Sequence, residues 1–395
     1  MEQEKELNAQ ATEPVRDPDQ EFREFLKRRQ KPLPVSWKLT CIFRRDITLI
    51  VLSGILAFWG WPLVEHLVPA RLASHPWLHL IAFACLQAVF MHIAMLWELI
   101  PPPKRETGED RETVLMIIAA LFWLFALIPA AAMMSILATV FFGLMWWSPD
   151  WWWVGATAYG LLFGHGWAKL LLPKRRQTRP LDQSEQWVEE RARTLTDGTG
   201  VGFSSISVLK SDGHDFDNNM LITGRGDRKA LLIGEPLLRW LSPPQVGSII
   251  AHELGHIALR HMLIRRVISA FTFAGTFYLI SIMLPPLSGY AGLSSSQEVA
   301  AFSLLYFLLQ SIAFLRTQLT NLVSRITERQ ADWWGFERNR DPEGFKEAML
   351  RFALLRNESV EAPSWQVFLR SHPTHAQRLA EADRWRREHP LDSGS

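Results

Sequence analysis

The chain has 395 residues and a formal net charge of +2, so its charge balance gives no indication of a nucleic-acid partner. Trp is unusually frequent, with 18 residues, and this side chain favours the boundary between a membrane and water. The two cysteines have neither the spacing of metal ligands nor that of a disulfide framework, which favours a reducing environment.

The segment before the first apolar run, Met1–Gln30, is charged and has no apolar core. It therefore differs from a cleavable signal peptide. The pattern predicts a cytoplasmic tail that is partly disordered up to about Pro18.

Several apolar segments are long enough to cross a bilayer, which takes about 20 residues. We expect six spans: Ile47–Val64, Trp77–Trp97, Thr113–Trp147, Trp151–Leu172, Val267–Leu287 and Val299 to about Leu322. The third segment is too long for one simple span and short for two, and Pro129 lies near its middle. We expect it to cross once, tilted or kinked; a hairpin at Pro129 would give seven spans instead.

Basic residues near the span ends indicate the orientation, because they collect on the cytoplasmic side. They precede the first span, follow the second at Lys104 and Arg105, and follow the fourth at Lys174 and Arg175. The stretch MWWSPDWWW, Met145–Trp153, has no basic residue and is typical of an outer interfacial belt. These signs agree with six spans and a cytoplasmic N-terminus.

A polar region follows the fourth span. Helical spacing occurs over Gln183–Leu195, and Phe203–Lys210 alternates like a strand. The segments Asn218–Gly224 and Lys229–Gly234 flank the turn-like tetrapeptide RGDR, which predicts a hairpin.

The sequence HELGH occurs on the next predicted helix. Ser242 suits the cap of this helix, Pro243 its first position, and Gln245 completes a capping box. His252 and His256 are four residues apart, so both imidazoles project from one face and can hold one ion. Glu253, one step round the helix, would act as the general base towards a water molecule. The alternative is a chance match on an amphipathic helix.

A second pair of spaced residues follows the last span, in SRITERQADWWG. Glu328 and Asp332 lie on one helical face, and two intervening spans return this helix to the side of HELGH. Glu328 could be the third ligand, with Asp332 orienting a ligating histidine. The alternative is a solvated helix end in which Arg325 and Arg329 pair with these acids.

HELGH, two membrane helices and then S-R-x-x-E-x-x-A-D resemble the integral-membrane zinc metallopeptidase family of the type I CAAX prenyl proteases and HtpX. NNMLITG is similar to the N-A-x-x-x-G edge strand of that family, with Met220 in place of the usual Ala. SHPTHAQR, Ser371–Arg378, is similar to its H-P-x-x-x-x-R segment. The resemblance covers ordered motifs from about Leu181 to Ala380 and is weak before them.

The resemblance implies one Zn²⁺ per chain and a set of site residues. It implies His252, His256 and Glu328 as metal ligands, Glu253 as base, His372 as oxyanion stabiliser, Asp332 and Arg378 as supports of the ligands, and Asn219 on a strand that pairs with substrate. His/His/Glu ligation fits zinc well, although it leaves iron or cobalt open. The chain departs from HtpX-like proteins in having four spans before HELGH and not two. Prenylated-peptide processing does not carry over, because the membrane region lacks the signatures of the prenyl proteases.

The expected fold is mostly α, with about six membrane helices and a cytoplasmic α+β zincin-like metallopeptidase domain. The expected divisions are a tail (1–45), four spans (46–172), the edge strand and HELGH helix (173–262), two spans (263–323), and the third-ligand helix with the C-terminal part (324–395).

The expected function is zinc-dependent cleavage of membrane or unfolded proteins at the cytoplasmic face, in a bacterial inner membrane. A non-catalytic membrane adaptor with a retained metal site is the alternative, although the intact Glu253 argues against it. A site-two type intramembrane protease would place HELGH inside a span, and Pro243 and Arg260 argue against that.

Overall fold

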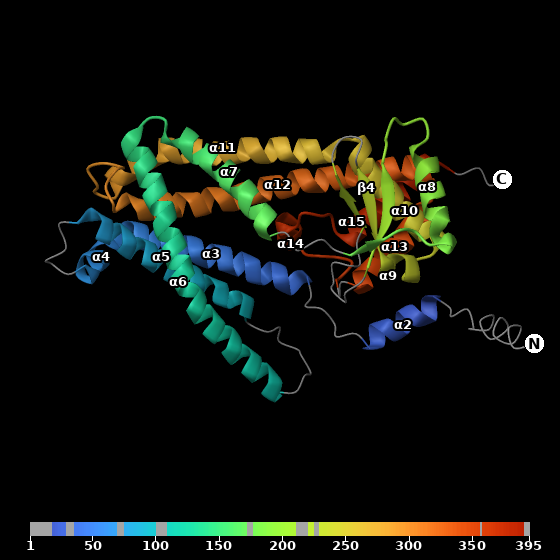
Figure 1. Ribbon diagram of the computed structural model, residues 1–395, viewed down its shortest axis with the longest axis horizontal. Helices are drawn as coiled ribbons and strands as arrows, with labels where there is room; N and C mark the ends of the chain where they lie inside the picture. Colours follow the sequence, from blue (N-terminus) through green and yellow to red (C-terminus); the bar gives the residue numbers. More distant parts are fainter. Residues whose placement is uncertain are drawn as a thin grey trace, which may run out of the picture.

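The computed structural model describes residues 18–28, 35–68, 75–99, 109–171, 177–210, 220–224, 229–355 and 358–390. Long helices form one end of the molecule, and a smaller unit with a sheet forms the other (Figure 1). The fold is therefore mostly helical with a small α+β part.

Seven helices of the described residues make up the long-helix end. They are α3 (Val35–Trp59), α4 (Trp61–Leu67), α5 (Pro76–Leu99), α6 (Glu109–Trp147), α7 (Trp152–Leu171), α11 (His261–Tyr290) and α12 (Ala301–Asn339). Their shared core is apolar and includes Phe83, Phe141, Phe277 and Leu304.

Four helices within the described residues are long and apolar enough to cross a membrane. The qualifying segments are Trp77–Leu96, Leu127–Trp147, His261–Tyr290 and Ala301–Asn339. The four lie within the predicted second, third, fifth and sixth spans or extend them. The predicted first and fourth spans correspond to helices α3 and α7, which do not meet these criteria over the described residues.

Two details of the predicted spans are decided by proline. The predicted first span, Ile47–Val64, is not one helix, because α3 ends at Trp59 and α4 begins at Trp61. Pro62 lies in the first turn of α4, where its missing N–H costs no hydrogen bond. Pro129, in contrast, lies inside α6, which continues as a single helix, so the hairpin alternative is not observed.

The smaller unit contains a four-stranded sheet with the order β1-β2-β4-β3. The strands are β1 (Thr178–Arg179), β2 (Ser205–Leu209), β3 (Met220–Thr223) and β4 (Ala230–Gly234). β2 and β4 are parallel, whereas β3 pairs antiparallel with β4. The predicted hairpin is thus confirmed, its RGDR turn lies outside the described residues, and β3 is an edge strand.

Short helices surround this sheet. They are η2 (Gln183–Glu185), α8 (Gln186–Thr196), α9 (Glu235–Trp240), α10 (Pro243–Ala258), α13 (Pro342–Leu355), α14 (Ser364–Leu369) and α15 (His375–Glu388). α10 is the central one and contacts α8, α12, α13 and β3. It begins with the predicted capping box, in which the Ser242 backbone N–H donates to Oε1 of Gln245 over 3.2 Å. HELGH therefore belongs to the core of the sheet-containing unit.

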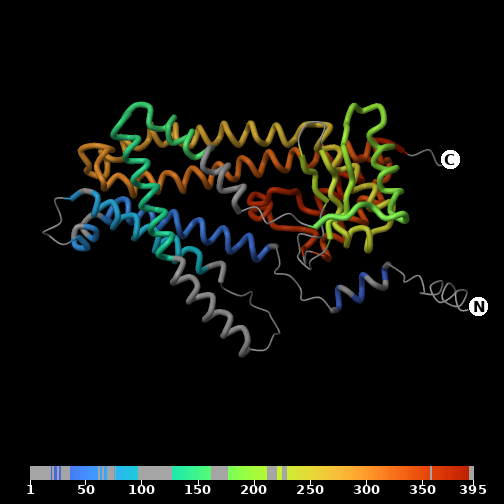
Figure 2. Tube along the Cα trace, in the orientation of Figure 1, coloured from blue at the N-terminus to red at the C-terminus, as the bar shows by residue number. Residues whose placement is uncertain are grey.

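One helix joins the two ends of the molecule. α12 is continuous over 39 residues, and Figure 2 shows it running from the long-helix end into the sheet-containing unit. Its first part packs beside α11 and α3, and its last part packs against α10. A membrane helix and a wall of the site are thus parts of one rod.

The N-terminal tail contains a helix that the sequence did not predict. α2 spans Pro18–Arg28 and contacts α9. Phe22 is buried there, and the centre of its ring is 6.0 Å from that of Trp240. The guanidinium group of Arg351 lies over the Phe22 ring. The residues before Pro18, expected to be partly disordered, lie outside the described part of the chain.

Candidate metal centre

The two histidines of HELGH meet at one point. His252 and His256 are one helical turn apart on α10, and their Nε2 atoms are 3.2 Å apart. The facing helix comes close because position 255 is glycine, and a Cβ there would lie 3.0 Å from the carbonyl oxygen of Ala331. The close crossing of α10 and α12 brings the third predicted residue within reach.

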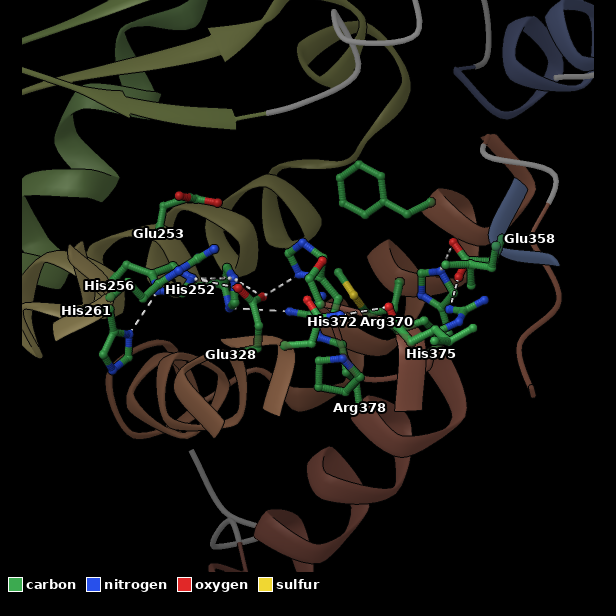
Figure 3. Close-up of a pocket in the computed structure, with 18 of the residues that line it drawn as sticks. His252, Glu253, His256, His261, Glu328, Glu358, Arg370, His372, His375 and Arg378 are labelled. Carbon is green, nitrogen blue, oxygen red and sulfur yellow. Dashed lines mark hydrogen bonds and ion pairs between the residues drawn. The ribbon is translucent and has the colours of Figure 1, made fainter. Parts of the chain in front are cut away.

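Glu328, on α12, completes a group of three potential ligands with His252 and His256. Its carboxylate oxygens lie 3.5 Å from Nε2 of His252 and 3.5 Å from Nε2 of His256. Ligand atoms bound tetrahedrally to one zinc ion, about 2.0–2.1 Å away, lie about 3.3–3.4 Å from one another. Oε2 of Glu328 faces His252 and Oε1 faces His256, so the spacing of the three side chains is close to that of ligands around one zinc ion (Figure 3).

A buried ion pair supports His252 from behind. Asp332 accepts a hydrogen bond from Nδ1 of His252 over 2.8 Å. The same carboxylate accepts from Nε of Arg378 over 2.9 Å and from its Nη2 over 2.6 Å. Asp332 is only 1 % exposed, and burial of its negative charge costs free energy. The two hydrogen bonds from Arg378 offset this cost. With the Nδ1 proton directed to Asp332, the Nε2 lone pair of His252 faces the ligand group.

The alternative, in which Arg325 and Arg329 pair with Glu328 and Asp332, is not observed: the arginine that pairs with Asp332 is Arg378. Arg325 instead donates to the backbone carbonyl oxygens of Phe368 and Arg370. It thereby fastens the segment that carries His372.

Glu253 projects from α10 on a different side from the two imidazoles (Figure 3). It lines the same cavity, and no described residue donates a hydrogen bond to its carboxylate. Burial raises the pKa of Glu253 to about 7. Burial, together with the neighbouring His252, lowers the pKa of His256 to about 3, so that ring is neutral near pH 7, as a metal ligand must be.

His372 reaches the group from the segment between α14 and α15. Its Nδ1 lies 3.1 Å from Oε2 of Glu328, and more than half of the side chain is exposed. The segment is held by Asn321, which donates to the carbonyl oxygen of Leu369 over 2.9 Å. The structure thus brings His372 beside the predicted ligands.

A second charged cluster, which was not predicted from the sequence, flanks the His372 segment. Glu358 pairs with Arg370, two residues before His372, and lies 3.5 Å from Nε2 of His375, three residues after it. All three side chains are nearly buried. The cluster closes the loop that presents His372.

The cavity that contains these residues has a volume of about 720 Å³. The edge strand β3 contributes Met220, Leu221 and Ile222 to its wall, and α3 contributes Leu39 and Ile42. Asn219, predicted on this strand, lies outside the described residues.

Comparison with known proteins identifies a family. A family model, described as Peptidase family M48, matches residues 182–386, slightly more than half of the chain. The chain belongs to peptidase family M48. The match begins after the four predicted N-terminal spans and contains all seven described site residues.

Individual relatives match over part of their length. An uncharacterized metalloprotease of Bacillus subtilis, YhfN, is 24% identical over 210 residues, covering 52% of this chain and 49% of that protein. Protease HtpX of Escherichia coli is 25% identical over 197 residues, covering 45% of this chain and 66% of HtpX. The chain thus spans about half to two thirds of the length of these M48-like relatives.

A solved structure extends the likeness to the whole fold. Ste24p of S. mikatae superposes with a TM-score of 0.53 at 14% identity, covering 88% of this chain and 99% of Ste24p. At this identity the likeness concerns the fold alone. It extends to helices before residue 182, which the M48 match does not reach.

Proposed function

We propose that the protein is a membrane metalloendopeptidase that cleaves membrane or unfolded proteins at the cytoplasmic face. The observation that carries the proposal is the convergence of three potential ligand side chains in one cavity with Glu253, to which no described residue donates a hydrogen bond. Membership of family M48 supports it independently.

The ligands of the metal would be His252, His256 and Glu328, and the donor set favours zinc. A zinc ion held there would supply a Lewis acid that polarises a substrate carbonyl and acidifies a water molecule. Asp332 and Arg378 would hold His252 in the orientation and tautomer that this requires.

The remaining chemistry would fall to two side chains. Glu253 takes a proton from the attacking water while the water oxygen forms its bond to the peptide carbon. Glu253 then gives that proton to the leaving nitrogen as the C–N bond breaks. His372 donates a hydrogen bond to the oxygen that becomes negative. A Glu253 pKa near 7 suits a group that both accepts and returns a proton.

An extended peptide would bind along β3, whose outer edge pairs with no other strand among the described residues. The cavity beside it also reaches α3 and, on α12, Thr317 and Asn321, which lie at the end of the predicted sixth span. A substrate in the cavity would therefore lie next to the membrane boundary. This position favours membrane-associated polypeptides over soluble folded proteins.

The proposed orientation places the N-terminus and the M48 region in the cytoplasm, in a bacterial inner membrane. The four apolar helices and the distribution of Lys and Arg support it. The six-span count and the five-part division of the chain are proposals on the same grounds.

The decisive experiment compares the wild-type protein with Glu253→Gln on an unfolded protein substrate in detergent, at equal metal content. Glu361→Gln, an exposed carboxylate outside the cavity, is the matched control. We expect cleavage by the wild type and the control, and none by metal-loaded Glu253→Gln. Cleavage by Glu253→Gln would refute the mechanism, and metal binding without cleavage by any variant would favour the adaptor.

A further inference from the structure

A third histidine contacts the metal centre without belonging to its ligands. His261 is the first residue of α11 and is 1 % exposed. It follows Arg260, whose φ of 53° is left-handed, a conformation that costs a non-glycine residue free energy. Such backbone strain persists where surrounding contacts determine it, often near functional sites. Here the turn folds His261 back against His256.

Two hydrogen bonds join His261 to its surroundings. Its Nδ1 lies 2.9 Å from Nδ1 of His256, and its Nε2 lies 3.2 Å from Oε1 of Gln330 on α12. The chain of contacts therefore runs from α12 through α11 to the ligand on α10.

Only one arrangement of protons satisfies both contacts with neutral rings. The amide oxygen of Gln330 can only accept, so Nε2 of His261 carries the proton. Nδ1 of neutral His261 is then an acceptor, and Nδ1 of His256 must donate to it. This leaves the lone pair of His256 on Nε2, the atom that faces His252 and Glu328.

We propose that His261, held by Gln330, is a positioning residue that fixes the tautomer and ring orientation of His256 for metal binding. The inference rests on the proposed function. His252 would be fixed by a charged partner, Asp332, and His256 by a neutral one, so the two ligands differ in their support. A hydrogen-bond partner on the far ring nitrogen typically contributes 10- to 100-fold to metal affinity.

Three substitutions at one position separate hydrogen bonding from packing. His261→Leu removes both contacts. His261→Asn keeps an acceptor near the position of Nδ1, facing His256, whereas His261→Gln keeps a polar atom near the position of Nε2, facing Gln330. Gln330→Leu, at an exposed position, tests the outer contact without disturbing the core.

The measurement is the Zn²⁺ dissociation constant of the full-length protein in detergent, by competition with a chromogenic chelator. The visible spectrum of the Co²⁺-loaded protein and its unfolding temperature are recorded alongside. We expect His261→Leu and His261→Gln to weaken Zn²⁺ binding by about 10- to 100-fold, His261→Asn to stay within a few-fold of wild type, and Gln330→Leu to lie between.

The results distinguish this inference from the function on which it rests. Wild-type affinity in His261→Leu would overturn the inference and leave the proposed function intact. Equal losses in His261→Asn and His261→Leu, in step with their unfolding temperatures, would also overturn it, because packing would then explain both. A wild-type protein that binds no Zn²⁺ would instead overturn the proposed function.

Discussion

Gly255 of α10 and Ala331 of α12 lie so close together that a side chain at position 255 would press against the backbone of α12. A Cβ on Gly255 would be 3.0 Å from the carbonyl oxygen and 3.1 Å from the Cα of Ala331. Both are backbone atoms, which cannot rotate away. The distance between the helices, and with it the distance between the histidines and Glu328, therefore depends on this glycine.

The first prediction concerns this crossing. Gly255→Ala should force α10 and α12 apart, lower the free energy of unfolding by about 1–3 kcal/mol and weaken metal binding. The control is Gly275→Ala in α11, where a Cβ would meet no atom within 4 Å. Chemical unfolding and Zn²⁺ titration check both effects. Unchanged metal affinity in Gly255→Ala would mean that the crossing does not set the ligand geometry.

The second prediction concerns the third ligand. Glu328→Ala should weaken Zn²⁺ binding by more than the roughly 10- to 100-fold that loss of an outer partner causes, because a direct ligand is removed. Glu337→Ala, on the same helix but half exposed, should retain one metal ion per chain. Elemental analysis of the purified proteins checks this, and full zinc occupancy in Glu328→Ala would rule out the assignment.

The third prediction concerns pH and the cluster that flanks His372. Burial opposes the charged form of Glu358, but the contacts with His375 and Arg370 outweigh it and lower its pKa to about 2. An unfolded glutamate has a pKa of about 4.3, so its ionised form stabilises the fold above that pH. This contribution, on the order of 2–3 kcal/mol, is lost as the pH falls from about 4.3 to about 2.

Unfolding of the metal-free protein, measured between pH 7 and pH 2, tests this. The stability advantage of the wild type over Glu358→Gln should be constant down to about pH 4.5 and should shrink below it. Glu361→Gln, exposed in the same segment, should follow the wild type throughout. An advantage that does not change with pH would show that the Glu358 carboxylate is not the group that titrates.

The fourth prediction concerns orientation. A fluorescent reporter fused after Ser395 should lie in the cytoplasm, because the final spans return the chain to the side of the basic N-terminal segment. The same reporter fused after Leu293, between α11 and α12, should lie outside. Protease accessibility in spheroplasts checks both fusions, and an external C-terminus would overturn the charge argument or the span count.

Local spacing explains why the centre of the site could be predicted. His252 and His256, like Glu328 and Asp332, are four residues apart on helices, and helical geometry alone places each pair on one face. That His372 lies beside them could be expected only from resemblance, because no periodicity relates it to HELGH.

Other contacts could not be predicted, because they depend on conformations that the sequence disfavours or on tertiary contacts. His261 ends the run HELGHIALRH, but its return to His256 requires a left-handed Arg260. Docking of Phe22 on Trp240 and closure of the His372 loop by Glu358 both join distant segments. The end of α3 before Gly60 was missed because hydropathy alone defined that span.

α12 has a mechanical consequence as well. From Ala301 to Glu328 this helix is about 40 Å long, at 1.5 Å per residue. If the helix tilts by about 1° about its end at Ala301, Glu328 moves by about 0.7 Å. Spanning helices change tilt when bilayer thickness changes. A change in the thickness of a surrounding bilayer would therefore be expected to shift Glu328 relative to the two histidines of α10.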